Sequence, residues 1–420
     1  MSCETTAASH QLVDHLFRNR AGQMVAWLTR IFGAAHLDLA EEVVQDALVK
    51  ALQQWPYTGV PDNPGGWLFR VTRNRALDVL RRTAAFQERA QQIAADLERI
   101  ADLDPANEHA IEDDELRMVF MCCHPALTQD ARVALSLKTA GGFSVAEIAS
   151  AFLTSEATVA QRLVRAKRTL REHRVGLDLP RGEELASRVD SVLEVIYLLF
   201  NEGYNAHAGE TLVRDDLCGE ALRLGRLVAL SSQITAPAAH ALSALMAFQA
   251  ARLPARTDAN GEMVLLEDQD RSKWDRRLVA MGFAHLERSA QGPDLTAYHV
   301  QAAIAAVHAG AATAAGTKWD QILSLYDELM AINPSPVIAL NRAVALAKVH
   351  GPRVALEALL AIEDDPALSN YYLLPSVKGR LLAELGDRAA AADCFNQALA
   401  RPSTEPERRF LRRRLHACAD

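Results

Sequence analysis

The chain contains FSVAEIASAFLTSEATVAQRLVRAKR at residues 143–168, and this stretch decides how its fold is interpreted. Its apolar residues recur at helical spacing on both sides of a polar turn at residues 154–156, which predicts a helix-turn-helix. The second helix would turn Val159 and Leu163 inward and keep an Arg-rich face outward. Because Arg can pair with guanine or phosphate and Gln with adenine, that face suits the major groove of DNA. A helical hairpin with a merely solvated basic face is the alternative.

Length and composition favour several helical units. With 420 residues, the chain exceeds a typical single domain, so two or three folding units are expected. Half of its residues are hydrophobic and recur mostly at helical spacing, so we predict an all-α protein without an extended sheet. The formal net charge of -8 argues against nucleic-acid binding for the chain as a whole. Positive charge is nevertheless concentrated in residues 70–82 and 162–174.

The sequence predicts neither export nor membrane insertion, and a metal site is not favoured. Residues 1–10 lack a basic and an apolar region, and the longest apolar run, residues 195–200, is too short to span a bilayer. A cytoplasmic protein is therefore expected. The six cysteines lack paired spacing, which argues against a disulfide framework or a zinc site. Cys122 and Cys123 would point about 100° apart on a helix, so packing explains them better than metal ligation.

Breaks in the helical periodicity divide the chain into several parts. The expected parts are a first unit at residues 10–82, an acidic linker at 83–115, the helix-turn-helix unit at 116–174, a helical extension at 183–291 and repeats at 292–420. In the first unit, helices are expected from residue 12 to 32, from a cap at Asp38 onward, and from Trp67 to Arg82. The Pro and Gly residues within 55–66 predict a loop between the last two helices.

The C-terminal part has a weak internal repeat. Asn333-Pro334, Asp365-Pro366 and Arg401-Pro402 each close an expected helix pair, near the ~34-residue period of tetratricopeptide repeats. About three such units are needed to bury a continuous core. We therefore expect tetratricopeptide-like repeats, with an unspecific helical bundle as the alternative.

Two long motifs precede the helix-turn-helix, and the three together resemble a known family. They are EEVVQDAL at residues 41–48 and WLFRVTRNRALDVLRR at residues 67–82. In this order they resemble bacterial sigma factors of the extracytoplasmic-function type, over about residues 10–174. The remaining chain resembles the extension of one branch of that family, on the motifs CCHPAL at 122–127, NEGY at 201–204 and DQDRSKWD at 268–275. The last motif usually has Arg where Lys273 stands, and this change keeps the charge.

The resemblance implies a role for each motif of the first two domains. The first domain would bind the clamp helices of RNA polymerase core and the minus-ten promoter element, and the second would bind the minus-35 element. Core docking falls to Glu42, Gln45 and Asp46, unless they form only a solvated acidic face. Minus-ten contacts and strand melting need aromatic stacking and cations. The residues expected to supply them are Trp67, Arg70, Arg73, Asn74 and Arg75. Minus-35 contacts fall to Thr158, Gln161 and Arg165 at base edges and to Arg162, Lys167 and Arg168 at phosphates.

Two of these assignments have alternatives within the fold itself. Trp67 could belong to the core instead of stacking on a base. Arg162 could turn back toward its own domain, because it lies off the face that Gln161 and Arg165 share.

The extension motifs contain more charge than a packing surface needs. Their candidate functional residues are Asn201, Glu202, Tyr204, Asp268, Asp270, Arg271, Trp274 and Asp275. The three aspartates could hold a metal or act in catalysis. We favour a contact that seals the extension against the sigma domains, with Arg–carboxylate pairs around the Trp274 anchor.

The resulting prediction is a promoter-specificity subunit of RNA polymerase whose activity its own extension modulates. It is not expected to be an enzyme or to need a cofactor or metal, and the repeats could bind a protein partner. A tetratricopeptide scaffold, or a DNA-binding regulator that is not a sigma subunit, is the alternative, although a scaffold would not need an Arg-rich helix. A hydrolase built on Asp268, Asp270 and His285 or His299 lacks an accompanying nucleophile or phosphate loop.

Overall fold

The computed structural model describes residues 20–82, 108–152, 154–180, 182–204, 213–292 and 294–419. Regular structure in these ranges is helical apart from an isolated antiparallel bridge between Thr257 and Met263, so the expected all-α fold class is confirmed there. No helix in the same ranges is long and apolar enough to cross a membrane. The chain divides into two compact units, Met1–Val195 and Ile196–Asp420.

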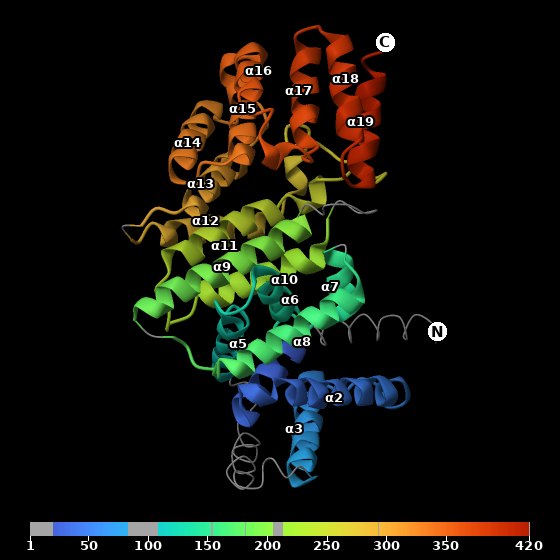
Figure 1. Ribbon diagram of the computed structural model, residues 1–420, viewed down its shortest axis with the longest axis vertical. Helices are drawn as coiled ribbons and strands as arrows, with labels where there is room; N and C mark the ends of the chain where they lie inside the picture. The colour runs from blue at the N-terminus through green and yellow to red at the C-terminus, as the bar shows by residue number, and fades with distance from the viewer. Residues whose placement is uncertain are drawn as a thin grey trace. The chain divides into compact units, whose positions relative to one another are not determined.

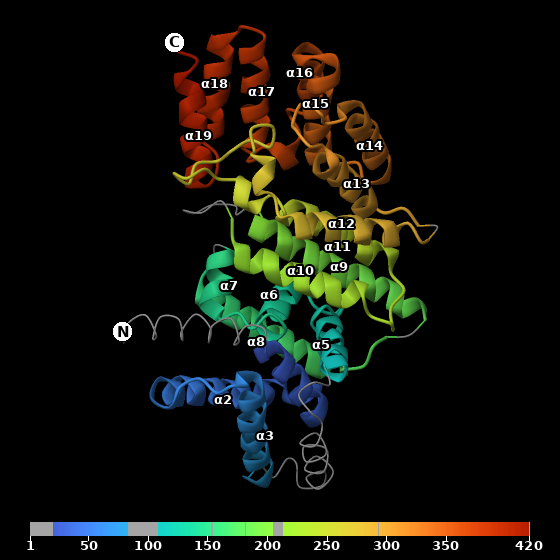
Figure 2. The same ribbon diagram turned by 180° about the vertical axis from the view of Figure 1, so that it is seen from behind.

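The first unit contains the helices of both expected sigma domains (Figures 1 and 2). After helical residues 20–32 come η1 (Ala34–His36), α2 (Leu37–Thr58), α3 (Pro64–Arg82), α5 (Glu108–Cys122), α6 (Gln129–Thr139), α7 (Val145–Ala151), α8 (Glu156–Glu172) and the start of α9 (Glu183–Tyr204). Residues 12–19 of the expected first helix and 83–107 of the expected linker lie outside the described residues. From Glu108 onward the expected linker is helix α5.

Helix α2 begins earlier than the sequence indicates. Its N-cap is His36, so the expectation that Asp38 caps it is wrong. Asp38 lies inside the first turn instead, where a carboxylate is favourable beside the partial positive charge of the helix N-terminus.

Helix α2 also ends later than expected, and the loop shrinks to residues 59–63. The helix continues through Pro56 in its last turn, although a proline at this point cannot donate to the carbonyl four residues before it. Trp55, only 4% exposed, anchors that turn in the core. Gly59 ends the helix with a φ of 79°, which glycine adopts without strain, and its N–H donates to the Trp55 carbonyl.

Helices α7 and α8 form the expected helix-turn-helix. Ser144 and Glu147 form a capping box at the start of α7, and the Ser155 side chain accepts from the Thr158 N–H at the start of α8. The buried side of α8 consists of Val159, Leu163, Ala166 and Leu170. Because these four recur at helical spacing, the opposite side of α8 remains free for polar residues.

The second unit continues from α9 into a larger set of helices. These are α10 (Asp215–Ala229), α11 (Pro237–Ala250), η3 (Leu253–Ala255), η4 (Arg271–Lys273), α12 (Arg276–Ser289), α13 (Ala297–Gly310), α14 (Trp319–Ile332), α15 (Pro336–His350), α16 (Pro352–Leu360), η5 (Pro366–Leu368), α17 (Leu373–Glu384), α18 (Arg388–Leu399) and α19 (Glu405–His416). Helix α11 is buried along nearly its whole length and packs against α10, α12 and α13.

The proline dipeptides that suggested a repeat fall after every second helix. Asn333-Pro334 follows α14, Asp365-Pro366 follows α16, and Arg401-Pro402 follows α18. The helices before each break, α13 with α14, α15 with α16 and α17 with α18, pack against each other. One apolar core runs through α13–α17, and a second joins α18 and α19 to Tyr372. In both ribbon views, α17, α18 and α19 lie side by side (Figures 1 and 2).

Candidate nucleic-acid interface

The outer side of α8 carries three residues expected at base edges. Thr158, Gln161 and Arg165 are all exposed, and Gln161 and Arg165 lie four residues apart on one face. The Thr158 hydroxyl lies 2.8 Å from the Ser155 hydroxyl, so the capping turn of the helix holds it in place. Arg168 is also exposed, with Glu172 at 3.5 Å. These side chains form an open polar surface of amide, hydroxyl and guanidinium groups.

Lys167, expected at phosphates, lies in a cluster with carboxylates of α2. Its ammonium is 2.7 Å from Asp38 and 2.8 Å from Glu41, and its side chain is 12% exposed. Burial opposes the charged form, but the two carboxylates outweigh it and raise the pKa of Lys167. Arg171 reaches the same Asp38 at 3.7 Å. The sequence motifs did not predict this cluster, because Lys167 is about 130 residues from its two carboxylate partners in the sequence.

Arg162 also turns away from the open surface of α8. Its guanidinium lies 2.9 Å from Asp130 of α6, within the same helix-turn-helix unit. Its side chain is 28% exposed.

The face of α3 contains both packed and solvent-exposed residues. Trp67 is half-buried and meets Trp55 edge to face, with ring centroids 5.4 Å apart. Arg70 and Asn74 are exposed, and the half-buried Arg73 donates to the Asn74 side-chain oxygen at 3.3 Å. The indole of Trp67 thus has a packing role, while the polar residues of α3 remain accessible.

An expected DNA contact and an expected polymerase contact pair with each other. The Arg75 guanidinium lies 2.7 Å from the Asp46 carboxylate, which joins α3 to α2. Glu42 and Gln45 are exposed on α2. Two residues that the motifs assigned to different partners are therefore in contact in this structure.

The segment 268–275 uses its aspartates to organise the backbone. Asp270 accepts from the Ser272 N–H at 3.0 Å and begins η4. Asp275 accepts from the Arg277 and Leu278 N–H groups, at 2.8 and 3.2 Å, and caps α12. No set of three His, Cys, Asp or Glu side chains in the described ranges could hold a metal ion.

Arg271 and Trp274 form the buried centre of this segment. The Arg271 guanidinium donates to the carbonyls of His308 and Ala311, at 2.6 and 2.7 Å, and to the Thr317 hydroxyl at 3.1 Å. It also stacks on the indole of Trp274, 4.9 Å from the ring centroid. In the part of the chain that the structure describes, Arg271 thus has no carboxylate partner, contrary to the expected Arg–carboxylate pairing. It binds oxygens in the last turn of α13 and directly after it, in its own unit, because free carbonyls at a helix end need donors.

The NEGY motif forms the last turn of α9. Glu202 is buried, Asn201 and Tyr204 are half-buried, and the Arg256 guanidinium lies 4.0 Å from the Tyr204 ring centroid. Arg256 also donates to the Tyr204 carbonyl. At Gly203 a Cβ would approach the Cys218 nitrogen to 2.7 Å, so only glycine fits there.

The two adjacent cysteines pack in the core of the first unit. The Cys122 sulfur lies 2.9 Å from the Thr139 hydroxyl, and the Cys123 sulfur lies 3.6 Å from that of Ser136. Burial raises the pKa of both thiols, that of Cys123 to about 11. These neutral thiols fill space, as expected.

Comparison with known families finds matches in three parts of the chain. Sigma-70 region 2 matches residues 16–86, sigma-70 region 4 matches residues 117–170, and a family of unknown function (DUF6596) matches residues 188–290. No solved structure matches the chain significantly.

One relative matches almost the whole chain, and two match only its first part. The uncharacterized protein R00370 of Rhizobium meliloti (strain 1021) is 39% identical over 407 residues, covering 95% of this chain and 94% of the relative. The ECF RNA polymerase sigma factor SigE of Mycolicibacterium smegmatis is 27% identical over 38% of this chain and 60% of its own length. SigK of Mycobacterium ulcerans, an ECF sigma factor too, is 29% identical over 34% of this chain and 79% of its own length.

The relative that spans the chain and the two sigma-70 regions together identify it. The chain belongs to the same family as R00370: it is a sigma factor of the extracytoplasmic-function type, with sigma-70 regions 2 and 4 followed by a helical DUF6596 extension.

Proposed function

We propose that this protein directs RNA polymerase core to specific promoters and does so in the cytoplasm. The observation that carries the proposal is the open polar surface of α8, on a helix-turn-helix that follows a match to sigma-70 region 2. A tetratricopeptide scaffold would have no use for Gln161 and Arg165 exposed on one helix face.

In this proposal α8 reads the minus-35 element. Thr158, Gln161 and Arg165 approach base edges, while Arg168 approaches a phosphate. Arg162 and Lys167 would reach phosphates only after leaving Asp130 and the α2 carboxylates. Promoter binding would therefore compete with the Lys167 cluster, because a phosphate would replace Asp38 and Glu41 as its partner.

Region 2 would supply the minus-ten contacts and the polymerase contact. Arg70, Arg73 and Asn74 offer donors to the melted strand, and Trp67 offers the free part of its ring for stacking. Arg75 would act together with Asp46, since the two are paired. Glu42 and Gln45, exposed on α2, would contact the clamp helices of the polymerase, and Asp46 would complete that surface.

The extension would modulate this activity through its repeats. We propose that α13–α18 form three tetratricopeptide-like units, on the basis of their paired packing and the proline breaks between pairs. Domain limits at residues 82, 174 and 291 belong to this proposal and are supported by the ends of α3, α8 and α12 at Arg82, Glu172 and Ser289. The expected limit at residue 116 falls inside α5, which begins at Glu108.

Run-off transcription with core polymerase tests the proposal directly. The full chain should support initiation from its cognate promoter, and charge reversal of Glu42 and Asp46 to Lys should weaken capture of core polymerase. Glu328→Lys, a charge reversal at an exposed residue of α14, is the control and should leave capture unchanged. A wild-type chain that binds no core polymerase even at low salt would refute the sigma function.

A further inference from the structure

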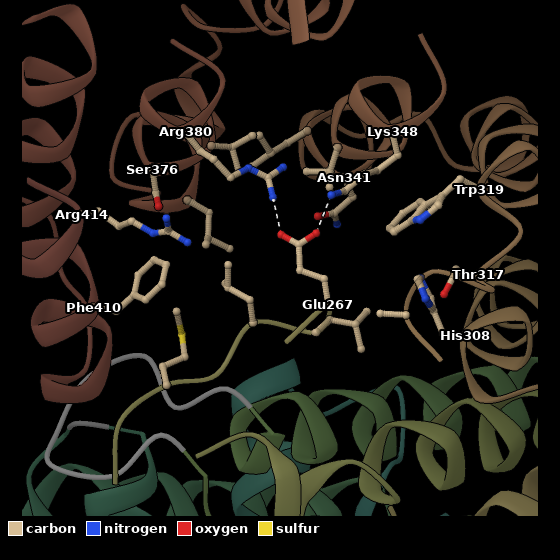
Figure 3. A pocket seen from close by; sticks show the side chains of 18 of the residues that line it. Glu267, His308, Thr317, Trp319, Asn341, Lys348, Ser376, Arg380, Phe410 and Arg414 are labelled. Atoms are coloured by element: carbon tan, nitrogen blue, oxygen red, sulfur yellow. Dashed lines mark hydrogen bonds and ion pairs between the residues drawn. The ribbon is translucent and has the colours of Figure 1, made fainter. Parts of the chain in front are cut away.

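The C-terminal helices enclose a cavity that a segment of this chain partly occupies. The cavity has a volume of about 490 Å³ and is lined by α15, α17 and α19 together with residues 263 and 265–267 (Figure 3). Arg271, His308, Thr317 and Trp319 also contribute to its wall. Figure 3 shows Glu267 reaching into its middle, toward Lys348 and Arg380 on the helices opposite.

Glu267 joins two helices of the cavity wall. Its carboxylate lies 2.5 Å from the Lys348 ammonium of α15 and 3.5 Å from the Arg380 guanidinium of α17. Burial acts to raise the pKa of Glu267, but the hydrogen bond from Lys348 and the charges of Lys348, Arg380 and Arg414 lower it. The cavity therefore favours a carboxylate at this point.

A second carboxylate of the same segment is held by α19. Glu262 lies 3.7 Å from the Arg409 guanidinium and also pairs with Arg413. Arg409 donates to the Gly261 carbonyl as well, at 3.0 Å, so α19 binds both backbone and side chain of the segment. Residues 261–267 are thus held by cations from three helices, through two carboxylates five positions apart.

The segment does not use up the binding capacity of these helices. Arg414 of α19 lines the cavity and stacks on Phe410 at 5.2 Å, and in the described part of the chain it forms no ion pair. Beside the two carboxylates, Leu265 and Leu266 lie among apolar lining residues such as Leu340 and Val344, yet unfilled volume remains. The surface therefore suits a chain with more acidic and apolar side chains than residues 261–267 offer.

We propose that α15, α17 and α19 form a binding site for an extended acidic segment of a protein partner, and that residues 261–267 occupy this site as an internal competitor. The seated segment carries the argument, because cations of three helices hold its two carboxylates and α19 also binds the Gly261 carbonyl, as they would in a bound acidic peptide. This inference goes beyond promoter recognition and needs no polymerase for its test. A carboxylate-bearing partner would displace Glu262 and Glu267 and release the segment.

The probe for this site is a fluorescent peptide with the sequence of residues 257–270, TDANGEMVLLEDQD, added to the full chain. The wild-type chain should bind it weakly, because the tethered copy competes at an effective concentration in the millimolar range, ~1 mM or more. Glu262→Gln with Glu267→Gln weakens the tethered copy and should tighten peptide binding about tenfold or more, measured by fluorescence anisotropy. Adding Lys348→Met to that variant should reverse most of the gain, because a cation of the site is lost.

Two controls separate this site from general charge attraction and from misfolding. A scrambled peptide of the same composition should bind at least about tenfold more weakly than the probe to the double variant. In the wild-type chain, a large excess of the probe should speed hydrogen exchange of residues 261–267, which requires no substitution. Equal binding of both peptides, an affinity unaltered by the Glu→Gln changes, or unchanged exchange at saturating peptide would each overturn the proposal.

Discussion

Helix α8 and the segment 268–275 are both dense in charge, but they use it in opposite ways. On α8, Gln161 and Arg165 extend outward from a helix whose other side is packed. In the segment, Asp270 and Asp275 accept backbone N–H groups, and Arg271 is buried against carbonyls. Charges beside turns are close to backbone groups that need partners, whereas charges on the outer face of a regular helix are not.

This difference assigns the two regions to different tasks. The exposed Arg165 of α8 is accessible to a ligand, so removing it should change recognition more than stability. The charges of the segment hold the second unit together, so removing them should change stability first and transcription as a consequence. Both statements can be tested by substitutions in each region, with DNA recognition and unfolding free energy measured for each variant.

The largest effect is expected at Trp274, which is 3% exposed. Trp274→Ala removes a buried indole and the surface on which Arg271 stacks, so the second unit should lose about 3–5 kcal/mol of unfolding free energy. Denaturant unfolding followed by circular dichroism measures the loss, and the first unit should keep its own transition. Promoter-dependent transcription should change as well. Normal transcription by a normally folded variant would show that the segment 268–275 has no regulatory role.

A somewhat smaller loss is expected at Arg271. Arg271→Ala leaves the carbonyls of His308 and Ala311 without their donor, which should cost about 2–4 kcal/mol of unfolding free energy. Lys273→Ala, an exposed cation two residues away, is the matched control and should change stability by less than about 0.5 kcal/mol. If both variants lost the same stability, Arg271 would have no special role.

At Arg165 the expected change is in recognition. Arg165→Ala should lose on the order of 1–3 kcal/mol of binding free energy at the cognate promoter, with a relaxed preference at one base position and unchanged folding. Lys167→Ala should weaken all DNA sequences alike, and less than a free phosphate contact would, because its charge already has partners. Promoter titrations with single-base changes measure this, and a loss at Arg165 that is equal for every sequence would show that it reads no base.

The sequence predicted more of the fold than of the site. Helical periodicity identified α7, α8 and the proline-bounded helix pairs, because local spacing determines which residues become buried. It failed where a distant contact overrides a local signal: buried Trp55 keeps α2 helical through Pro56. The pairing of Lys167 with Asp38, of Arg75 with Asp46 and of Glu267 with Lys348 depends on tertiary packing, for which a single sequence contains no local pattern.

The smallest expected effect concerns His308, whose carbonyl accepts from Arg271 and whose ring meets Trp319 edge to face. Burial, with the charges of Arg252 and Arg271, lowers the pKa of His308 from 6.5 to about 4. Between these values the unfolded chain binds more protons than the folded one, so acid destabilises the second unit.

From pH 7.5 to pH 6 this histidine should cost about 1 kcal/mol of unfolding free energy. His308→Gln should remove that increment from the pH dependence measured by denaturant unfolding, while His350→Gln, exposed at the end of α15, should leave it intact. Burial of an ionisable group beside Arg271 would then have a measurable cost, in contrast to the exposed cations of α8. An identical pH dependence in wild type and His308→Gln would mean that the ring is hydrated and that the centre around Arg271 is more open than its contacts indicate.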